Sequence, residues 1–113
     1  MRKIFIITSN NEISQIFITG KRYQSRHLTA IVANNKRHDK NGRVAFIAGK
    51  KLGNAVIRNR SKRVLRAAAD ICNLPLPHTD ILLIANKNTA LAHTHQCAES
   101  LNIIINNIKN DVL

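Results

Sequence analysis

The sequence predicts a single α+β domain in which three helices pack with a small set of strands. Three observations carry this prediction. Apolar residues recur at helical spacing in three segments, short apolar runs of strand length separate them, and one helical segment is strongly basic. A chain of 113 residues is long enough for one modest hydrophobic core, so we expect one domain over residues 1–113.

The first predicted helix begins near Ser9. The residues from Ser9 to Glu12 form a capping-box pattern, in which a hydroxyl and a carboxylate bind free N–H groups of the first turn. Apolar residues follow at helical spacing, and Gly20 is expected to end the helix. The short apolar run at residues 3–7 fits a further strand or none, and the sequence leaves both open.

Three strands and two more helices follow. The strands are expected at residues 27–33, 43–48 and 80–85, a polar loop at 34–42, and the helices at 54–72 and 89–109. The third strand is almost entirely apolar, which predicts burial on both of its faces. Pro75 and Pro77 prevent the preceding helix from continuing. The last helix is expected to direct one apolar face at the core, formed by Leu91, Ala98, Leu101, Ile105 and Ile108.

The helix predicted at residues 54–72 separates an apolar stripe from a basic surface. The stripe spans about 120° of the helical circumference and consists of Ile57, Ser61, Val64, Leu65, Ala68 and Ile71. The rest of the circumference carries Arg58, Asn59, Arg60, Lys62, Arg63 and Arg66. Because residues 51–66 contain no acid that could pair with these cations, the surface predicts a polyanionic partner.

Arginine predominates on this surface, and its planar fork matches a phosphate with two hydrogen bonds. Gly53 suits a turn and Asn54 suits the N-cap of the helix. The free N–H groups of the first turn would therefore lie beside Lys50 and Lys51 and form a second anion site. The pattern thus favours phosphate groups as ligands over a merely solvated basic face.

The overall charge distribution agrees with a polyanionic partner. Residues 1–66 carry sixteen basic against two acidic side chains, a formal charge of +14, whereas residues 67–113 carry two basic against four acidic ones, a charge of −2. No apolar run approaches the ~18 residues of a membrane span or the ~7–15 of a signal peptide. We therefore expect a cytoplasmic protein without a membrane partner, in which Cys72 and Cys97 stay reduced.

The sequence contains no recognisable catalytic constellation. No two of its six acidic residues are closer than ten positions, and it has no phosphate-binding glycine loop, nucleophile elbow or zinc-finger spacing. His93 and Cys97, with His95 between them, have the spacing of two metal ligands on one helix. A pair without two further ligands is more often incidental, so we expect neither a metal site nor a catalytic residue.

The basic run resembles the signature of the bacterial ribonuclease P protein family, in which Arg-Asn-Arg lies within a longer string of fixed positions. Twelve positions match: Lys50, Lys51, Gly53, Asn54, Ala55, Val56, Arg58, Asn59, Arg60, Lys62, Arg63 and Arg66. The resemblance implies a small mixed sheet packed by three helices, related to a domain of one small-subunit ribosomal protein. It also implies a left-handed strand–helix–strand crossover, against the usual rule.

The resemblance further implies a function. The chain would be the protein subunit of a ribonucleoprotein whose RNA subunit, with Mg²⁺, removes the 5′ leader from precursor tRNA. The protein would bind the catalytic RNA and the single-stranded leader, raise substrate and metal affinity, hold no cofactor by itself and need no protein partner. The residues implied to bind RNA are Lys50, Lys51, Asn54, Arg58, Asn59, Arg60, Lys62, Arg63 and Arg66. Those implied to line the leader cleft are Ile13, Phe17 and Ile31.

Departures from the family pattern concern the cleft. The family often places aromatic residues there, where unpaired bases stack, but only Phe17 keeps a ring. For Ile13 and Ile31, ordinary core packing is an equal alternative. Asn86 also replaces a common basic residue, and Gly49 replaces a usual Ser. Two other functions remain open, a ribosomal RNA-binding protein without a role in tRNA processing and an architectural DNA-binding protein.

Overall fold

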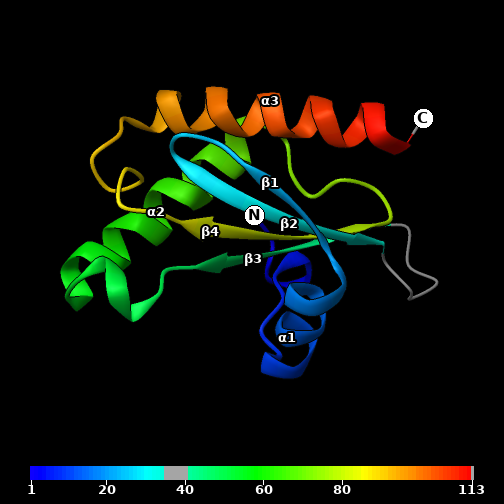
Figure 1. Cartoon of the computed structure of the whole chain (residues 1–113), viewed down its shortest axis with the longest axis horizontal. Helices are drawn as coiled ribbons and strands as arrows, with labels where there is room; N and C mark the ends of the chain where they lie inside the picture. Colours follow the sequence, from blue (N-terminus) through cyan, green and yellow to red (C-terminus); the bar gives the residue numbers. More distant parts are fainter. Residues whose placement is uncertain (35–40, 113) are drawn as a thin grey trace.

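The computed structural model describes residues 1–34 and 41–112 of the chain, and within them three α-helices pack on a four-stranded sheet (Figure 1). The helices are α1 (Asn10–Thr19), α2 (Ala55–Ile71) and α3 (Thr94–Val112). The strands are β1 (Lys21–Gln24), β2 (Leu28–Asn34), β3 (Arg43–Ile47) and β4 (Thr79–Ala85), and two short 3₁₀ helices are η1 (Lys3–Phe5) and η2 (Lys50–Leu52). The α+β class is thereby confirmed, while most of the expected loop at 34–42 lies outside the described residues.

The sheet is mixed, with the strand order β1-β2-β4-β3. β1 pairs with β2 and β2 with β4 in antiparallel fashion, whereas β3 and β4 are parallel and are connected through α2. Ile81, Leu82 and Leu83 in β4 are fully buried. The expectation that this strand is buried on both faces is therefore confirmed, because it lies between β2 and β3 with helices on either side.

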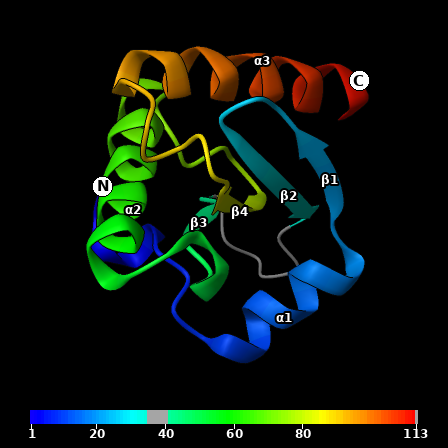
Figure 2. The same cartoon turned by 60° about the vertical axis from the view of Figure 1, so that its left-hand side comes forward.

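Two hydrophobic clusters cover the two faces of the sheet. Because side chains alternate along a strand, Ile81 and Leu83 belong to the larger cluster, and Leu82 belongs to the smaller one. α2 and α3 pack on the face of the larger cluster, and α1 packs on the opposite face (Figure 2). The two faces thus hold different helices, and the basic helix α2 is remote from α1.

Strand β1 was not predicted. Its sequence Lys-Arg-Tyr-Gln has no apolar alternation, and it forms one edge strand of the sheet with β2 as its partner. The Lys21 ammonium and the Tyr23 hydroxyl both donate to Asp111 of α3, at 2.8 and 2.7 Å. The strand conformation of residues 21–24 thus depends on pairing with β2 and on this contact with α3. Neither interaction can be predicted from the residues of the segment itself.

The prediction that the last helix begins at residue 89 is wrong, because α3 begins at Thr94. The preceding segment is held by polar contacts: the side-chain amides of Asn86 and Asn88 donate to the Arg26 carbonyl at 3.1 and 3.0 Å. Such side-chain bonds compete with helix formation. Leu91, which was expected to face the core, is consequently 83% exposed.

The amino-terminal residues form a turn and no extra strand. η1 replaces the strand considered for residues 3–7, and the Ile7 N–H then donates to the Val44 carbonyl at 2.9 Å.

Gly20 ends α1 as predicted but has a φ of −77°, so the left-handed conformation is not the reason for glycine. A Cβ at this position would lie 2.5 Å from Cγ2 of Ile31, so close packing of α1 on β2 requires the glycine.

Candidate RNA interface

The amino-terminal end of α2 has the predicted cap. Asn54 is the N-cap residue, and its side-chain oxygen accepts a hydrogen bond from the Ile57 N–H at 3.1 Å. Gly53 has a φ of 138°, a conformation that side chains disfavour. η2 precedes it and exposes Lys50 and Lys51 close to the free N–H groups of the first helical turn. The predicted turn and N-cap are therefore confirmed, and the second anion site beside them stays a prediction.

The apolar stripe of α2 is buried only over its middle turns. Ser61, Leu65 and Ala68 are buried, whereas Ile57 and Ile71 are 41% and 49% exposed. Both ends of the predicted stripe therefore lie outside the core, which covers the central turns of the helix. Ser61 tolerates burial because its hydroxyl donates to the Ile57 carbonyl one turn earlier, at 2.9 Å.

The basic face of α2, comprising Arg58, Asn59, Arg60, Lys62, Arg63 and Arg66, is held in place by uncharged groups. Nε of Arg58 donates to the Ala48 carbonyl at 3.2 Å. Nε of Arg60 donates to the Ala90 carbonyl at 2.9 Å. Among the described residues, neither guanidinium group has a hydrogen-bond partner for its terminal nitrogens, and these are the atoms that form two parallel bonds to a phosphate.

Arg66 is placed by an aromatic ring. Its guanidinium carbon lies 5.5 Å from the centre of the Phe46 ring on β3, within the range of a cation–π contact. The contact orients an exposed side chain without neutralising its charge. In the parts of the chain that the structure describes, no ion pair involves a basic side chain of α2.

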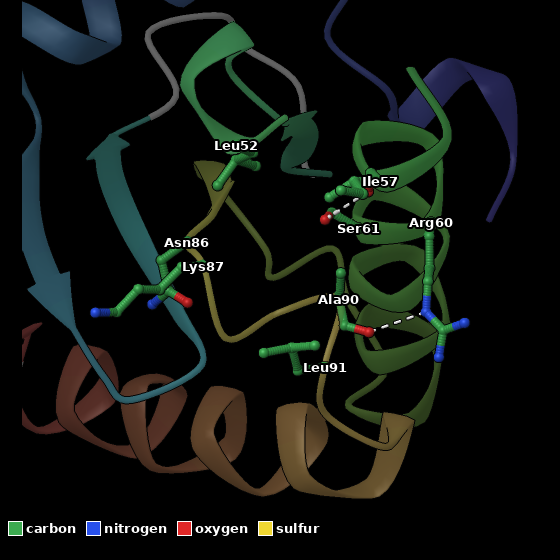
Figure 3. A pocket seen from close by; sticks show the side chains of 8 residues that line it. All are labelled: Leu52, Ile57, Arg60, Ser61, Asn86, Lys87, Ala90 and Leu91. Atoms are coloured by element: carbon green, nitrogen blue, oxygen red, sulfur yellow. Dashed lines mark hydrogen bonds between the residues drawn. The ribbon is translucent and has the colours of Figure 1, made fainter. Parts of the chain in front are cut away.

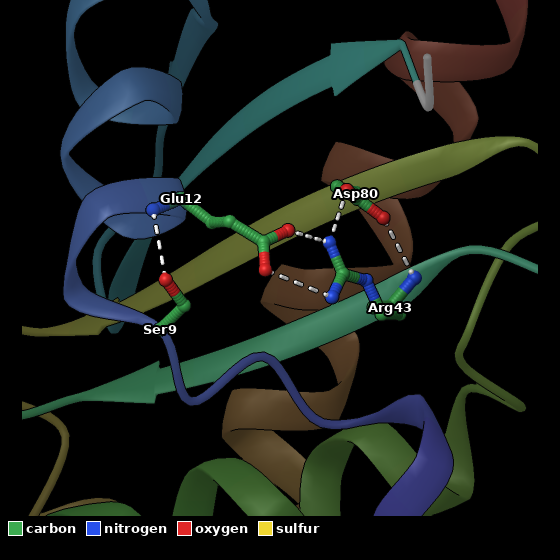
Figure 4. Close-up of polar contacts among 4 residues, drawn as sticks. All are labelled: Ser9, Glu12, Arg43 and Asp80. Atoms are coloured by element: carbon green, nitrogen blue, oxygen red, sulfur yellow. Dashed lines mark hydrogen bonds and ion pairs between the residues drawn. The ribbon is translucent and has the colours of Figure 1, made fainter. Parts of the chain in front are cut away.

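Four of the described acidic side chains, Glu12, Asp70, Asp80 and Asp111, pair with cations that do not belong to α2. Glu12 and Asp80 both bind Arg43, whose guanidinium connects α1 to the sheet (Figure 4). The Arg43 N–H also donates to Asp80 at 3.0 Å. Ser9 accepts from the Glu12 N–H, but the Glu12 carboxylate binds Arg43, so the capping box is formed in one direction only. Arg43 therefore belongs to the scaffold, and its charge is not part of the basic surface.

A second ionic contact lies at the carboxyl end of α3. The hydrogen bond from Lys21 lowers the pKa of Asp111, and the same bond raises the pKa of Lys21. Partial burial, followed by the hydrogen bond to Asp111, raises the pKa of Tyr23. These three groups connect β1 to α3.

The residues of the predicted leader cleft differ in exposure. Phe17 is 41% exposed, Ile13 is half-buried and Ile31 is 1% exposed. Ile31 belongs to the smaller cluster, which agrees with the core-packing alternative and leaves its side chain no surface for a ligand. Ile18, which the sequence did not single out, is 78% exposed next to Phe17. Phe17 and Ile18 thus form the exposed apolar part of α1.

His93, His95 and Cys97 do not come together. Cys97 is fully buried in the larger cluster, whereas both histidines are exposed. Burial raises the pKa of the Cys97 thiol. Within residues 1–34 and 41–112, no three His, Cys, Asp or Glu side chains are grouped so that they could hold a metal ion. The same residues include no helix with the length and apolar character needed to cross a membrane.

Comparison with known proteins agrees with this geometry. The family model described as "Ribonuclease P" matches residues 1–109. The chain belongs to the ribonuclease P protein family. The ribonuclease P protein component of Natranaerobius thermophilus is 31% identical over 98 residues, which are 86% of this chain and 84% of that protein.

Two solved ribonuclease P proteins share the fold. The Staphylococcus aureus protein has a TM-score of 0.78 and 28% identity, with 93% of this chain and 95% of that chain covered. The Thermotoga maritima protein has a TM-score of 0.74 and 20% identity, with 88% and 93% covered, and shows likeness of fold alone. The mixed sheet packed by three helices is thereby confirmed as the ribonuclease P protein fold.

Two departures from the ribonuclease P family pattern lie close to α2 and α3 in the sequence. At Gly49 an added Cβ would meet no atom within 4 Å, so this position has room for the serine that is usual there. Asn86 binds the Arg26 carbonyl through its amide nitrogen and accepts from the Asn88 N–H at 2.8 Å. Its side chain is thus part of the loop structure before α3. Neither residue disturbs the basic face of α2.

Proposed function

We propose that this chain is the protein subunit of a ribonuclease P holoenzyme and acts in the 5′ maturation of tRNA. The observation that carries the proposal is the basic face of α2. Three of its arginines are held by carbonyl groups and a ring, and no ion pair of the described residues involves a basic side chain of α2. Family membership names the polyanion that this face would bind, the catalytic RNA.

In the proposed complex the side chains of this chain bind and position RNA. We assign the cleavage step to the RNA subunit and its Mg²⁺ ions, as the resemblance to the ribonuclease P family implies. Lys50 and Lys51, with the amino-terminal end of α2, extend the phosphate-binding surface beyond the basic face of the helix. The protein would raise the affinity for substrate and metal without supplying a reacting group.

The leader of precursor tRNA would follow the face of α1. Phe17 offers an exposed ring there, and rings of this kind stack on unpaired bases. Ile13 is the half-buried neighbour of this path, while Ile31 supports it from the core. α1 and α2 lie on opposite faces of the sheet, so leader and catalytic RNA would meet different surfaces of the protein (Figure 2).

A cleavage assay tests the proposal against its rivals. Precursor tRNA and the cognate catalytic RNA are incubated at low Mg²⁺ with and without this chain, and removal of the leader is followed. The proposal expects faster cleavage with the chain present. Binding to ribosomal RNA without any effect on cleavage would support a ribosomal role, and binding to duplex DNA with no preference for the folded RNA would support an architectural one.

Replacement of Phe17 tests the leader path. Phe17→Leu keeps an apolar side chain but removes the ring, and loss of a base–aromatic stack costs up to about 1–3 kcal/mol. We expect weaker holoenzyme binding of precursor tRNA with a leader several nucleotides long. Binding of mature tRNA, measured in the same titration, should stay unchanged. Equal losses for both tRNAs would mean that Phe17 only packs α1 against the sheet.

A further inference from the structure

A hollow of about 490 Å³ lies where the amino-terminal half of α2 faces the loop between β4 and α3. This Leu91 hollow is lined by Leu52, Ile57, Arg60, Ser61, Asn86, Lys87, Ala90 and Leu91. In Figure 3, Ile57 and Ser61 project from α2 into the hollow. Leu52 lies at its upper end and Leu91 at its lower end in this view. Its volume falls within the range of small-ligand sites.

Aliphatic side chains that line the Leu91 hollow are open to solvent. Leu91 is 83% exposed and Ile57 is 41% exposed, although both are large aliphatic side chains. Leu91 does not pack into the core because polar contacts hold the loop before α3. Two aliphatic side chains at the rim of a hollow form a surface that gains free energy when it is covered.

The charge around the Leu91 hollow has one sign. Arg60 and Lys87 line it and no acidic residue does. The two segments that form it, residues 48–69 and 81–98, contain no Asp or Glu at all. Aliphatic side chains beside two cations and no carboxylate fit a ligand that joins a flat apolar body to a negative charge, which is the chemistry of a nucleotide.

Arg60 connects the Leu91 hollow to the basic face of α2. Its Nε donates to the Ala90 carbonyl, which holds the guanidinium across the edge of the hollow (Figure 3). The terminal nitrogens of this group lie on the surface that we assign to phosphates. A backbone that contacts α2 would therefore pass the opening, so that one of its bases could enter.

We propose that the Leu91 hollow receives one unpaired nucleotide of the catalytic RNA. Its base contacts Ile57 and Leu91, and its phosphate binds the terminal nitrogens of Arg60. The nucleotide is unpaired because a base inside a helix has both faces covered by its neighbours and cannot enter a side pocket. This inference rests on the proposed function and adds a base-contacting site to a surface otherwise suited to phosphates.

Substitution of the apolar wall tests the inference. Leu91→Ser and Ile57→Ser should each weaken binding of the cognate catalytic RNA roughly 3- to 30-fold, because the apolar cover of the base is lost. The slope of log affinity against log salt should stay unchanged, since neither substitution removes a basic side chain or the phosphate contact of Arg60. Leu91→Met should retain the affinity. Ile103→Ser, at a 62% exposed position of α3 outside the hollow, is the matched control and should bind like the wild type.

Crosslinking identifies the occupant. A benzophenone side chain placed at position 91 should crosslink to one unpaired nucleotide of the catalytic RNA. Wild-type affinity of both serine variants, or a crosslink to paired RNA or to a second copy of this chain, would overturn the inference while leaving the proposed function intact. Failure of the wild-type chain to bind the catalytic RNA would overturn both.

Discussion

Raising the monovalent salt concentration from about 50 to about 200 mM is expected to weaken binding to the catalytic RNA by roughly 100- to 500-fold. Five phosphate contacts would release enough counterions for a log–log slope of about −3.5 to −4.5. The five basic side chains on α2 supply such contacts, because none of them is paired with an acid in the described structure. Filter binding at constant Mg²⁺ gives the slope.

Single substitutions test whether the counterions are released from α2. Arg63→Ala removes an exposed cation of α2 and should make the slope less steep by about one. Lys109→Ala is the matched control, because it also removes one exposed cation but lies near the carboxyl end of α3, away from α2 (Figures 1 and 2). A wild-type slope near zero, or equal changes in both variants, would show that α2 is not the interface.

Leu83→Ala is expected to lower the free energy of unfolding by about 2–5 kcal/mol, a large part of the ~5–15 kcal/mol typical of small domains. Leu83 is fully buried in β4, between Ala30 of β2 and Phe46 of β3. Its side chain belongs to the cluster on which α2 and α3 pack, so truncation leaves a cavity beneath both helices. Urea unfolding measures the change.

The matched control for this substitution is Ile103→Ala. Ile103 has the same number of carbon atoms but is 62% exposed on α3, so its truncation should change stability by no more than about 0.5 kcal/mol. A loss for Leu83→Ala as small as that for Ile103→Ala would contradict the central position of β4 in the core. A change in the slope of the urea dependence would indicate an altered denatured state instead.

The elements that were predicted correctly have strong local patterns. α2 has an N-cap residue, a run of apolar positions at helical spacing and no acid in its basic portion, and all three signals lie within one segment. β4 is apolar enough to indicate burial on both faces. The errors arise where distant residues decide the structure, as in β1, which pairs with β2 and contacts Asp111.

In the candidate site, too, some features could be predicted from local sequence and others depend on distant residues. Phe17 was singled out and is exposed, whereas Ile31 is buried because α1 packs closely over β2. The exposure of Leu91 and the Leu91 hollow could not be predicted, since Asn86 and Asn88 hold their loop against the Arg26 carbonyl far away in the sequence. The apolar spacing that includes Leu91 predicts a helix, and it does not indicate that this contact will form instead.

The sequence by itself determined that this protein has a basic, arginine-rich helix with a capped amino-terminal end, because helical spacing and charge are local properties of the chain. The tertiary structure alone decided how those arginines are held. Arg58 and Arg60 donate to the backbone carbonyls of Ala48 and Ala90. Every residue has a backbone carbonyl, so the sequence does not indicate which carbonyls will accept these hydrogen bonds. Only the fold brings the carbonyls of Ala48 and Ala90 close to the two arginines.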